Sequence, residues 1–502
     1  MSAEAMRDIT EGPVGRAVLR LAWPVVASEA IHTLFHFVDL AWVGRLGAWA
    51  TASVSSSMFA LWTVFAIGNL VATGLTAQVS RAMGAGDRDR AAHVAAQGLL
   101  LAVGLGGLVG VAGWFGAGPL FHALGVSAEV ARGGASYFAI CAAGAPAAFF
   151  YLGSSAVMRS CGDTRTPLLV TASALAANGV LAPFLIYGWG PFPRWEVAGA
   201  AIATVLCMSA GAVAFLVIAA RGHRSFPFRA ASLAGPDFAV LTGQIRIGAP
   251  YALVGILFSV NYLVFARVAA AFGDAAVAVI GISNRLESVT YLGADGFAAA
   301  SATMVGQNLG AGRPDRAEKA ARIATAIMAV AATAYTALLL VAPALLLRIF
   351  TPDPQVVVLG CGYLRILALC QIATAVEGTL GGVFAGSGDT VPPMTIHLVF
   401  GLLRPPLAVL LVGPLGLAGV AVTITASCIV RASLLGGIFV RGRWKTHELP
   451  GWIPPPLPGD EAPDLSVGVP PFPGSPAPGR EASSRSAPPV ARSSRSGRPD
   501  PR

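Results

Sequence analysis

Twelve long apolar segments dominate the sequence, and their length limits the possible folds more than any other feature. Each is close to the roughly 20 residues that an α-helix needs to cross the hydrocarbon core of a bilayer. The segments are rich in Ala, Leu and Gly and do not alternate between polar and apolar residues, which favours helices over strands. We place them at about residues 17–42, 52–80, 92–117, 131–158, 166–188, 196–220, 245–271, 276–304, 320–345, 357–384, 392–413 and 417–440.

The composition supports an integral membrane protein. Hydrophobic residues make up 55% of the 502 residues and charged residues only 12%, whereas a soluble domain has about 25% charged residues. A chain so poor in charge must expose most of its surface to lipid. The net charge of +9 comes from Arg in short loops and in the C-terminal segment, without an aromatic-interleaved basic face, so we expect no nucleic-acid partner.

The sequence also repeats itself at a fixed spacing. A shift of 226 positions places Pro24 on Pro250 and keeps the halves aligned without a gap for more than a hundred residues. The same shift places the GAG motif at Gly84–Gly86 on the GAG motif at Gly310–Gly312. Each half holds an even number of helices, so both enter the membrane from the same side. We therefore predict an all-α integral membrane fold, with twelve transmembrane helices in two parallel six-helix repeats forming a two-lobe transporter.

The loops predict orientation and segment boundaries. Arg residues gather after the even-numbered helices, which by the positive-inside rule places these loops and both termini in the cytoplasm of a multi-pass plasma-membrane protein. Because the segment after Lys445 lacks an apolar pattern, we expect truncation there to leave transport intact. The predicted parts are a cytoplasmic N-terminal segment 1–16, an N-lobe 17–220, a cytoplasmic linker 221–243, a C-lobe 244–440 and a disordered cytoplasmic tail 441–502.

Four motifs resemble the multidrug and toxic compound extrusion (MATE) family of antiporters. They read VDLAWVGRLG from Val38, MRSCGDTRTP from Met158, VGQNLGAG from Val305 and AGSGDT from Ala385, within a resembling region of about 14–440. The resemblance implies two six-helix lobes around a V-shaped central cavity. It also implies export of cationic, aromatic or amphipathic compounds in exchange for H+ or Na+. No cofactor is implied, and the sequence lacks the phosphate-binding pattern GxxxxGK[ST].

The resemblance also points to individual residues. The family's carboxylate on the first helix falls on Asp39. The fifth helix of related prokaryotic members carries Asn, three further residues, and then Asp-Pro. Here Asn178 and Pro183 are kept, but Ala182 replaces the acid. This departure weakens the case for a mechanism in which two N-lobe acids share one cation.

Four ionisable residues share one face of the first predicted helix, at spacings of three, four and three: Glu29, His32, His36 and Asp39. At 100° per residue they occupy a stripe less than a quarter-turn wide. A charge at membrane depth costs at least about 2.5–3.5 kcal/mol, so we expect the stripe to face the protein interior or a water-filled cavity. The repeat counterparts carry no ionisable group, which indicates a role specific to the first half. They are Gly255, Phe258, Tyr262 and Phe265.

We interpret this stripe as a site of proton coupling. Asp39 is the expected main carboxylate, assisted by Glu29 and His36, with His32 alongside. Desolvation disfavours the charged form of a carboxyl, so a change in wetting between two states can drive proton uptake and release. One alternative is that the histidines are packing residues and Asp39 lies near a wet helix end close to Arg45. A metal site is another, because His32 and His36 have helical ligand spacing, but we expect neither metal nor cofactor.

Further polar residues inside the predicted helices are candidates for the substrate cavity: Asn178, Glu287, Asp295 and Glu377. For Glu287 the competing explanation is a salt bridge with Arg285, and for Asp295 it is a polar contact between the lobes. Arg404 on the eleventh predicted helix is a possible partner of any of these acids.

A proline lies in the first helix of each half, at Pro24 and Pro250. Proline removes a helix hydrogen bond and clashes with the preceding turn. Each proline therefore gives either a fixed kink or a hinge for alternating access, and both are candidate hinges. The GAG and GDT motifs are expected to be structural, because Gly permits left-handed backbone and Asp163 and Asp389 can accept backbone hydrogen bonds at helix starts.

These features favour a secondary active antiporter that exports organic cations or amphipathic drugs by alternating access. H+ is favoured over Na+ as the exchanged ion, because imidazoles titrate near physiological pH whereas Na+ prefers several oxygen ligands. We expect a monomer in the bilayer. One alternative is a flippase for lipid-linked or polysaccharide precursors, which would need a cationic cavity. A remote alternative is an intramembrane enzyme, although the sequence contains neither HExxH nor GxSxG.

Overall fold

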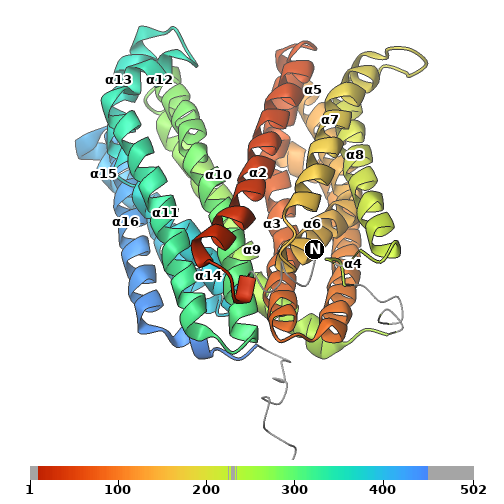
Figure 1. Cartoon of the computed structure of the whole chain (residues 1–502). Helices are drawn as coiled ribbons and strands as arrows, with labels where there is room; N and C mark the ends of the chain where they lie inside the picture. Colours follow the sequence, from red (N-terminus) through yellow and green to blue (C-terminus); the bar gives the residue numbers. More distant parts are fainter. Residues whose placement is uncertain (1–8, 224, 228–231, 233–234, 450–502) are drawn as a thin grey trace, which may run out of the picture. The chain divides into compact units, whose positions relative to one another are not determined.

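A computed structural model describes residues 9–223, 225–227, 232 and 235–449 of the chain. Helices dominate these residues and fall into two sets (Figure 1). The helices of the first repeat are α2 (Val14–Gly44), α3 (Ala48–Gly84), α4 (Arg88–Ala123), α5 (Ala128–Ala143), α6 (Ala145–Ser160), α7 (Arg165–Tyr187) and α8 (Glu196–Ala220). Those of the second repeat are α9 (Phe238–Ala270), α10 (Asp274–Gly310), α11 (Pro314–Val341), α12 (Pro343–Arg348), α13 (Pro354–Ala368), α14 (Gln371–Ser387), α15 (Val391–Leu415) and α16 (Ala418–Arg441).

The helix boundaries follow the repeat in the sequence. Helices α3 and α10 begin at Ala48 and Asp274, which are 226 positions apart. The same offset separates the starts of α4 and α11, of α5 and α13, of α6 and α14, and of α7 and α15. The all-helical fold predicted from two sequence repeats is thus confirmed.

Two predicted helices are bent rather than continuous. The predicted helix at 131–158 consists of α5 and α6, which meet at Gly144 with a bend of 52°. Its repeat counterpart consists of α13 and α14, with a bend of 48°. Pro146 lies in the first turn of α6, where its missing N–H breaks the hydrogen-bond ladder from α5. Similarly, α11 ends at Val341, before Pro343 starts α12.

Nine described helices are long and apolar enough to cross a membrane, or up to eleven spans if each bent pair is counted as one. Helix α10 is not among them. It matches the predicted segment 276–304 in position, but Arg285, Glu287 and Asp295 interrupt its apolar surface. These charges make α10 the least lipid-compatible of the long helices, as expected for a helix that packs among others.

Helix α2 passes from one repeat to the other (Figure 1). Its first turns, with Val14 and Val18, pack in one cluster with Met304 of α10 and Ala320 of α11. After Pro24 the helix turns to the first repeat, where the Tyr187 hydroxyl of α7 donates to the Trp42 carbonyl at 2.5 Å. Pro24 thus lies between the part of α2 that packs on the second repeat and the part that packs on the first.

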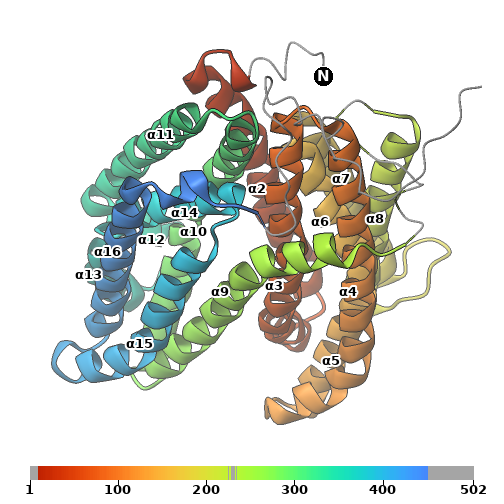
Figure 2. The same ribbon diagram turned by 90° about the horizontal axis from the view of Figure 1, so that it is seen from below.

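Helix α9 makes the equivalent crossing in the second repeat (Figure 2). Gly248, near its start, packs against the Leu70 carbonyl of α3. Beyond Pro250, Leu257 and Asn261 contact Gly401 of α15. The two crossing helices are therefore related by the repeat, with a proline near the change of partner in each.

The GAG motifs lie where α3 and α10 end beside each other. Arg81 donates through Nη2 to the Ser387 carbonyl at 3.1 Å, and its repeat counterpart Gln307 donates through Nε2 to the Ser160 carbonyl at 2.7 Å. Gly86 and Gly312 have φ of 78° and 68°, in the left-handed region that favours glycine. The structural role predicted for the GAG motifs agrees with this geometry.

The GDT motifs behave differently in the two repeats. Asp163 accepts from the backbone N–H of Thr166 at 3.0 Å and so caps the start of α7, as predicted. The Asp389 carboxylate instead lies 3.9 Å from Nδ1 of His447. His447 lies in the segment that follows α16. Its side chain, rather than a backbone N–H at the start of α15, is the described partner of Asp389.

The segment after α16 is packed as far as the structure describes it. A short 3-10 helix, η2 (Arg443–Thr446), buries the Trp444 side chain completely. Leu449 is 3% exposed and clusters with Ala77 of α3 and Ile247 of α9. The beginning of the predicted tail 441–502 is therefore structured, and residues 450–502 lie outside the described part.

The linker between the repeats is shorter than predicted, because α9 begins at Phe238 rather than near residue 244. Asp237 caps α9 and contacts His93 of α4, with Oδ2 3.0 Å from Nε2. The buried Gln97 side chain donates to the Gly235 carbonyl at 2.8 Å and accepts from the Asp237 backbone N–H at 2.9 Å. The end of the linker is thus held on α4.

Candidate functional site

The four ionisable residues of α2 differ in exposure along the helix. Asp39 is buried, with 6% of its surface exposed, Glu29 and His32 are half-buried, and His36 is exposed. The Oδ1 atom of Asp39 is buried and accepts no hydrogen bond from any described residue. A buried carboxylate oxygen without a donor is costly, so a proton or a cation would stabilise it.

Asp39 follows Val38, the residue through which α2 contacts α7 where the fifth predicted helix departs from the family pattern. Val38 of α2 lies against Gly179 of α7, the residue after Asn178. Asn178 is 1% exposed and donates through Nδ2 to Thr204 Oγ1 at 3.3 Å, while its Oδ1 atom has no donor among the described residues. Ala182, one turn further along, is buried and supplies no polar group. Each of the two helices therefore carries one buried oxygen without a described donor, on a residue next in sequence to this contact.

Glu29 and Asp295 meet at the boundary between the repeats. Gly296 of α10 packs on Val26 of α2, one turn before Glu29, and Asp295 interacts electrostatically with Glu29 and with Arg159 of α6. Asp295 is exposed. The predicted polar contact between the lobes and the predicted substrate role for Asp295 are therefore compatible, since an exposed acid at this boundary can serve both.

Glu287 and Glu377 have partners within the second repeat. Glu287 is 4% exposed and accepts a hydrogen bond from the Tyr262 hydroxyl at 2.9 Å. Glu377 is 7% exposed, and its Oε1 atom lies 2.5 Å from His397 Nε2 and 3.1 Å from Arg431 Nη2. The geometry around Glu377 favours a role in holding α14, α15 and α16 together over direct substrate contact.

The arginines considered as partners of these acids make their described hydrogen bonds and ring contacts elsewhere, but Arg404 does interact electrostatically with Glu287 and Glu377. Arg404 donates to Ser427 Oγ at 2.7 Å and to Cys428 Sγ at 3.1 Å. The Arg285 guanidinium lies over the Phe37 ring of α2, 5.4 Å from its centre. The salt bridge considered between Arg285 and Glu287 is not formed within the described part of the chain.

Sequence reasoning missed His397 and Arg431 as partners of Glu377. Both lie inside predicted membrane segments, where any ionisable residue is a candidate for a buried pair or a functional site. That signal was available in the sequence. It could not identify the partner, because three different helices contribute to the cluster.

The described residues contain no group of three or more His, Cys, Asp or Glu side chains arranged to hold a metal ion. His32 and His36 keep their helical spacing, but one is half-buried and the other exposed. The spacing that suggested a metal site is therefore not completed by further ligands within that part of the chain.

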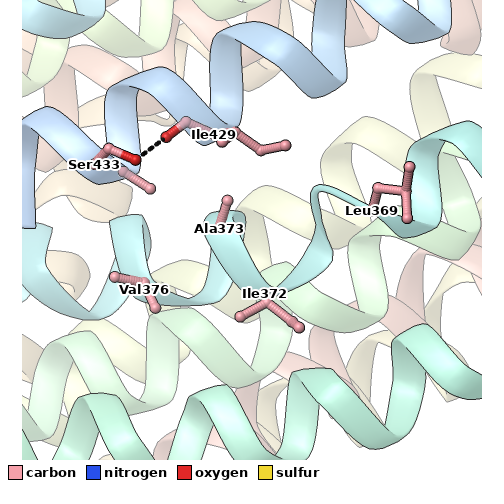
Figure 3. A pocket seen from close by; sticks show the side chains of 7 residues that line it. Leu369, Ile372, Ala373, Val376, Ile429 and Ser433 are labelled. Atoms are coloured by element: carbon pink, nitrogen blue, oxygen red, sulfur yellow. Dashed lines mark hydrogen bonds between the residues drawn. The ribbon is translucent and has the colours of Figure 1, made fainter.

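A cavity of about 340 Å³ lies elsewhere, between α14 and α16 (Figure 3). Its lining is apolar and includes Leu369, Ile372, Val376 and Ile429. The one hydroxyl group in the lining, that of Ser433, donates to the Ile429 carbonyl at 2.8 Å. With no ionisable group in its lining, this cavity cannot recognise a charged molecule, so the candidate site remains the polar surface around α2.

Comparison with known proteins supports the repeat and the fold. The MatE family model matches residues 24–184 and again 250–410, which lie 226 positions apart at both ends. A relative from Thermotoga maritima, described as "Probable multidrug resistance protein NorM", is 28% identical over 444 residues, covering 87% of this chain and 94% of that protein. A "FAD transporter" from Shewanella oneidensis is 29% identical over 379 residues, covering 74% and 83%. The solved structure of a MOP superfamily transporter from Pyrococcus furiosus has a TM-score of 0.82 at 22% identity, covering 89% and 100%, which shows a shared fold.

Proposed function

Because this chain belongs to the MatE family of membrane transporters, we propose that it is a secondary active antiporter that exports organic cations or amphipathic drugs in exchange for H+. The relative named as a multidrug resistance protein supports this substrate class. The transporter acts by alternating access, with α2 and α9 bending near Pro24 and Pro250, where each helix changes packing partners. It resides in the plasma membrane with both termini in the cytoplasm.

The observation that carries the proposal is the buried Oδ1 atom of Asp39, which has no donor among the described residues. Desolvation favours the neutral form of a carboxyl, so Asp39 binds a proton when its surroundings are dry and releases it when they are wet. An organic cation and a proton then compete for one negative charge. Such competition is the minimum requirement for exchange.

H+ is proposed over Na+ because of the surroundings of Asp39. Na+ prefers several oxygen ligands, and Ala182 stands where related members carry a second acid. Asn178 offers one oxygen without a donor, which leaves the local oxygen set small. His36, three residues before Asp39, is exposed and suits the role of a proton relay.

The charge of the accessible groups supports cationic substrates. Glu29, which is half-buried, and Asp295, which is exposed, lie at the boundary between the repeats. By contrast, Arg404 and Arg431 are buried and engaged in hydrogen bonds or an ion pair within the second repeat. The exposed Arg285 lies over the Phe37 ring. The two accessible acids at the boundary therefore carry the case for a cationic substrate over an anionic one or a flippase precursor.

The test is dye export from liposomes that contain the purified protein. With a pH gradient imposed, wild type exports ethidium, and Asp39→Asn folds normally but loses export because the exchangeable charge is gone. Glu29→Gln gives a partial defect, and Glu287→Gln gives a defect only if the substrate cavity extends into the second repeat. Full export by Asp39→Asn would refute Asp39 as the coupling group. Export that follows a Na+ gradient at equal pH would refute H+ coupling.

A further inference from the structure

Arg285 is a charged residue deep in α10 whose described partner is an aromatic ring. The helix begins at Asp274, so Arg285 lies about 16 Å along its axis. The guanidinium carbon is 5.4 Å from the centre of the Phe37 ring, within cation–π range. Glu287 pairs with Tyr262 instead, and no carboxylate in the described part of the chain forms an ion pair with Arg285.

Both members of this contact are accessible. Phe37 is 43% exposed, and Arg285 is also exposed. A cation at this depth without a carboxylate partner requires a water-filled surrounding, since its burial in lipid costs at least about 2.5–3.5 kcal/mol. Phe37 precedes the proposed coupling residue Asp39 by two positions on α2, but its ring lies on the exposed side of the helix whereas the Asp39 side chain is buried.

The contact also joins the two repeats. Phe37 belongs to the part of α2 that packs on α7, whereas Arg285 belongs to the second repeat. The repeat counterparts of these residues in the sequence are Leu263 and Phe59, which cannot form a cation–aromatic pair. The pair is therefore not required by the two-fold packing of the repeats and is specific to one side of the molecule.

We propose that the Phe37 ring is a binding face for aromatic organic cations, and that Arg285 is an internal cation which occupies this face until a substrate displaces it. The inference rests on the proposed function and adds a residue pair to it, in which a substrate with a delocalised positive charge takes the place of the Arg285 guanidinium on the Phe37 ring. Such molecules gain the ring contact that the guanidinium otherwise makes. Neutral amphipathic molecules lack the charge that a cation–π contact requires, so they do not replace Arg285 in it.

The experiment measures binding of ethidium and of the neutral dye N-phenyl-1-naphthylamine to the purified full-length protein by fluorescence. We expect Arg285→Gln to tighten ethidium binding at least about threefold, since the internal competitor is gone. Arg285→Lys, which keeps the charge, stays close to wild type. Phe37→Leu weakens ethidium binding and abolishes the effect of Arg285→Gln in the double variant, whereas Phe37→Tyr keeps the ring and binds normally. The neutral dye binds equally to wild type, Arg285→Gln and Arg285→Lys, because it does not depend on the charge at this position.

Several results would overturn the inference. Equal effects of Arg285→Gln on both dyes would show a general change in the cavity, and no effect on ethidium would show that Arg285 does not compete. If Arg285→Gln fails to fold, the comparison of Phe37→Leu with Phe37→Tyr decides, and equal ethidium binding by these two refutes the binding face. Ethidium export by wild type is measured in parallel. If wild type exports ethidium and the variants bind it as wild type does, the inference is refuted and the proposed function stands. If wild type neither binds nor exports ethidium, the inference and the proposed function are both refuted.

Discussion

The α-carbon of Gly84 in α3 packs so closely against the backbone carbonyl of Gln307 in α10 that no side chain would fit between them. The contact recurs with the repeats exchanged, because Gly310 packs in the same way against the Arg81 carbonyl. The second pair lies 226 positions from the first, as Gly84 corresponds to Gly310 and Arg81 to Gln307. The close approach of α3 and α10 therefore depends on glycine at two equivalent points.

Gly84→Ala is expected to lower the melting temperature of the purified protein. Alanine is favoured over glycine in a helix by about 1 kcal/mol, but the added methyl group would overlap the Gln307 carbonyl, and such overpacking costs typically 1–3 kcal/mol. Gly107→Ala in α4 is the matched control, because open space surrounds that position. The control should be neutral or slightly stabilising. Equal melting temperatures for both variants would show that α3 and α10 can separate without cost.

Glu377→Gln is expected to destabilise the second repeat strongly. The substitution leaves Arg431 buried without its carboxylate, and breaking one side of a buried pair costs about 3–5 kcal/mol. Arg431→Gln should have a similar effect, and the double variant should recover part of the loss because no charge is left unpaired. Thermal unfolding of the three variants measures this. A double variant as unstable as the sum of the single ones would contradict the pairing.

The lowered pKa of the Asp237 carboxyl allows a prediction of how the stability of the protein changes at acid pH. Its hydrogen bond with His93 holds the pKa of the carboxyl below its ordinary value, and the backbone N–H groups of Val240 and Ala239 act in the same direction. A lowered pKa means that the stabilisation is present above the unfolded value of about 3.9 and is lost as pH falls through the folded value.

Asp237→Asn should therefore lower the melting temperature at pH 7, and the difference from wild type should shrink as pH falls below about 3.9 and vanish only below the lower pKa of the folded state. The effect should be modest, because both side chains of the pair are 37% exposed and such pairs contribute about 0–1 kcal/mol. His93→Gln is the matched variant from α4. A difference from wild type that persists unchanged at acid pH would mean that the ionised carboxylate is not the stabilising form.

Truncation after Lys445 is now expected to destabilise the protein, in contrast to the expectation from sequence. The deletion removes Leu449, which is 3% exposed and lies against Ala77 and Ile247. Loss of a buried leucine side chain costs about 2–5 kcal/mol. Leu449→Ala should reproduce much of the loss, whereas truncation after Leu449 keeps these contacts and serves as control. Equal stability of the two truncated proteins would show that the packed segment contributes nothing.

The sequence by itself determined the number of repeats, their offset and the placement of nearly every long helix. Apolar length and glycine motifs at a constant spacing are local properties of the chain, so they can be read without knowing which helices touch. Asp39 became a candidate residue in the same way, because a carboxylate inside an apolar segment is unusual whichever helices surround it. Bends were missed at Gly144 and near Leu369, since hydropathy averaged over a window does not register a broken hydrogen-bond ladder.

The tertiary structure alone decided which polar groups are partners. Glu377 pairs with His397 and Arg431 on two other helices. Arg285 contacts Phe37 across the boundary between the repeats and not Glu287, which is two residues away. In an α-helix, residues two apart point in different directions, so proximity in sequence predicts little about contact. Partner choice depends on how the helices rotate and cross, and that is set by the packing of the whole bundle, including the glycine contacts that bring α3 and α10 together.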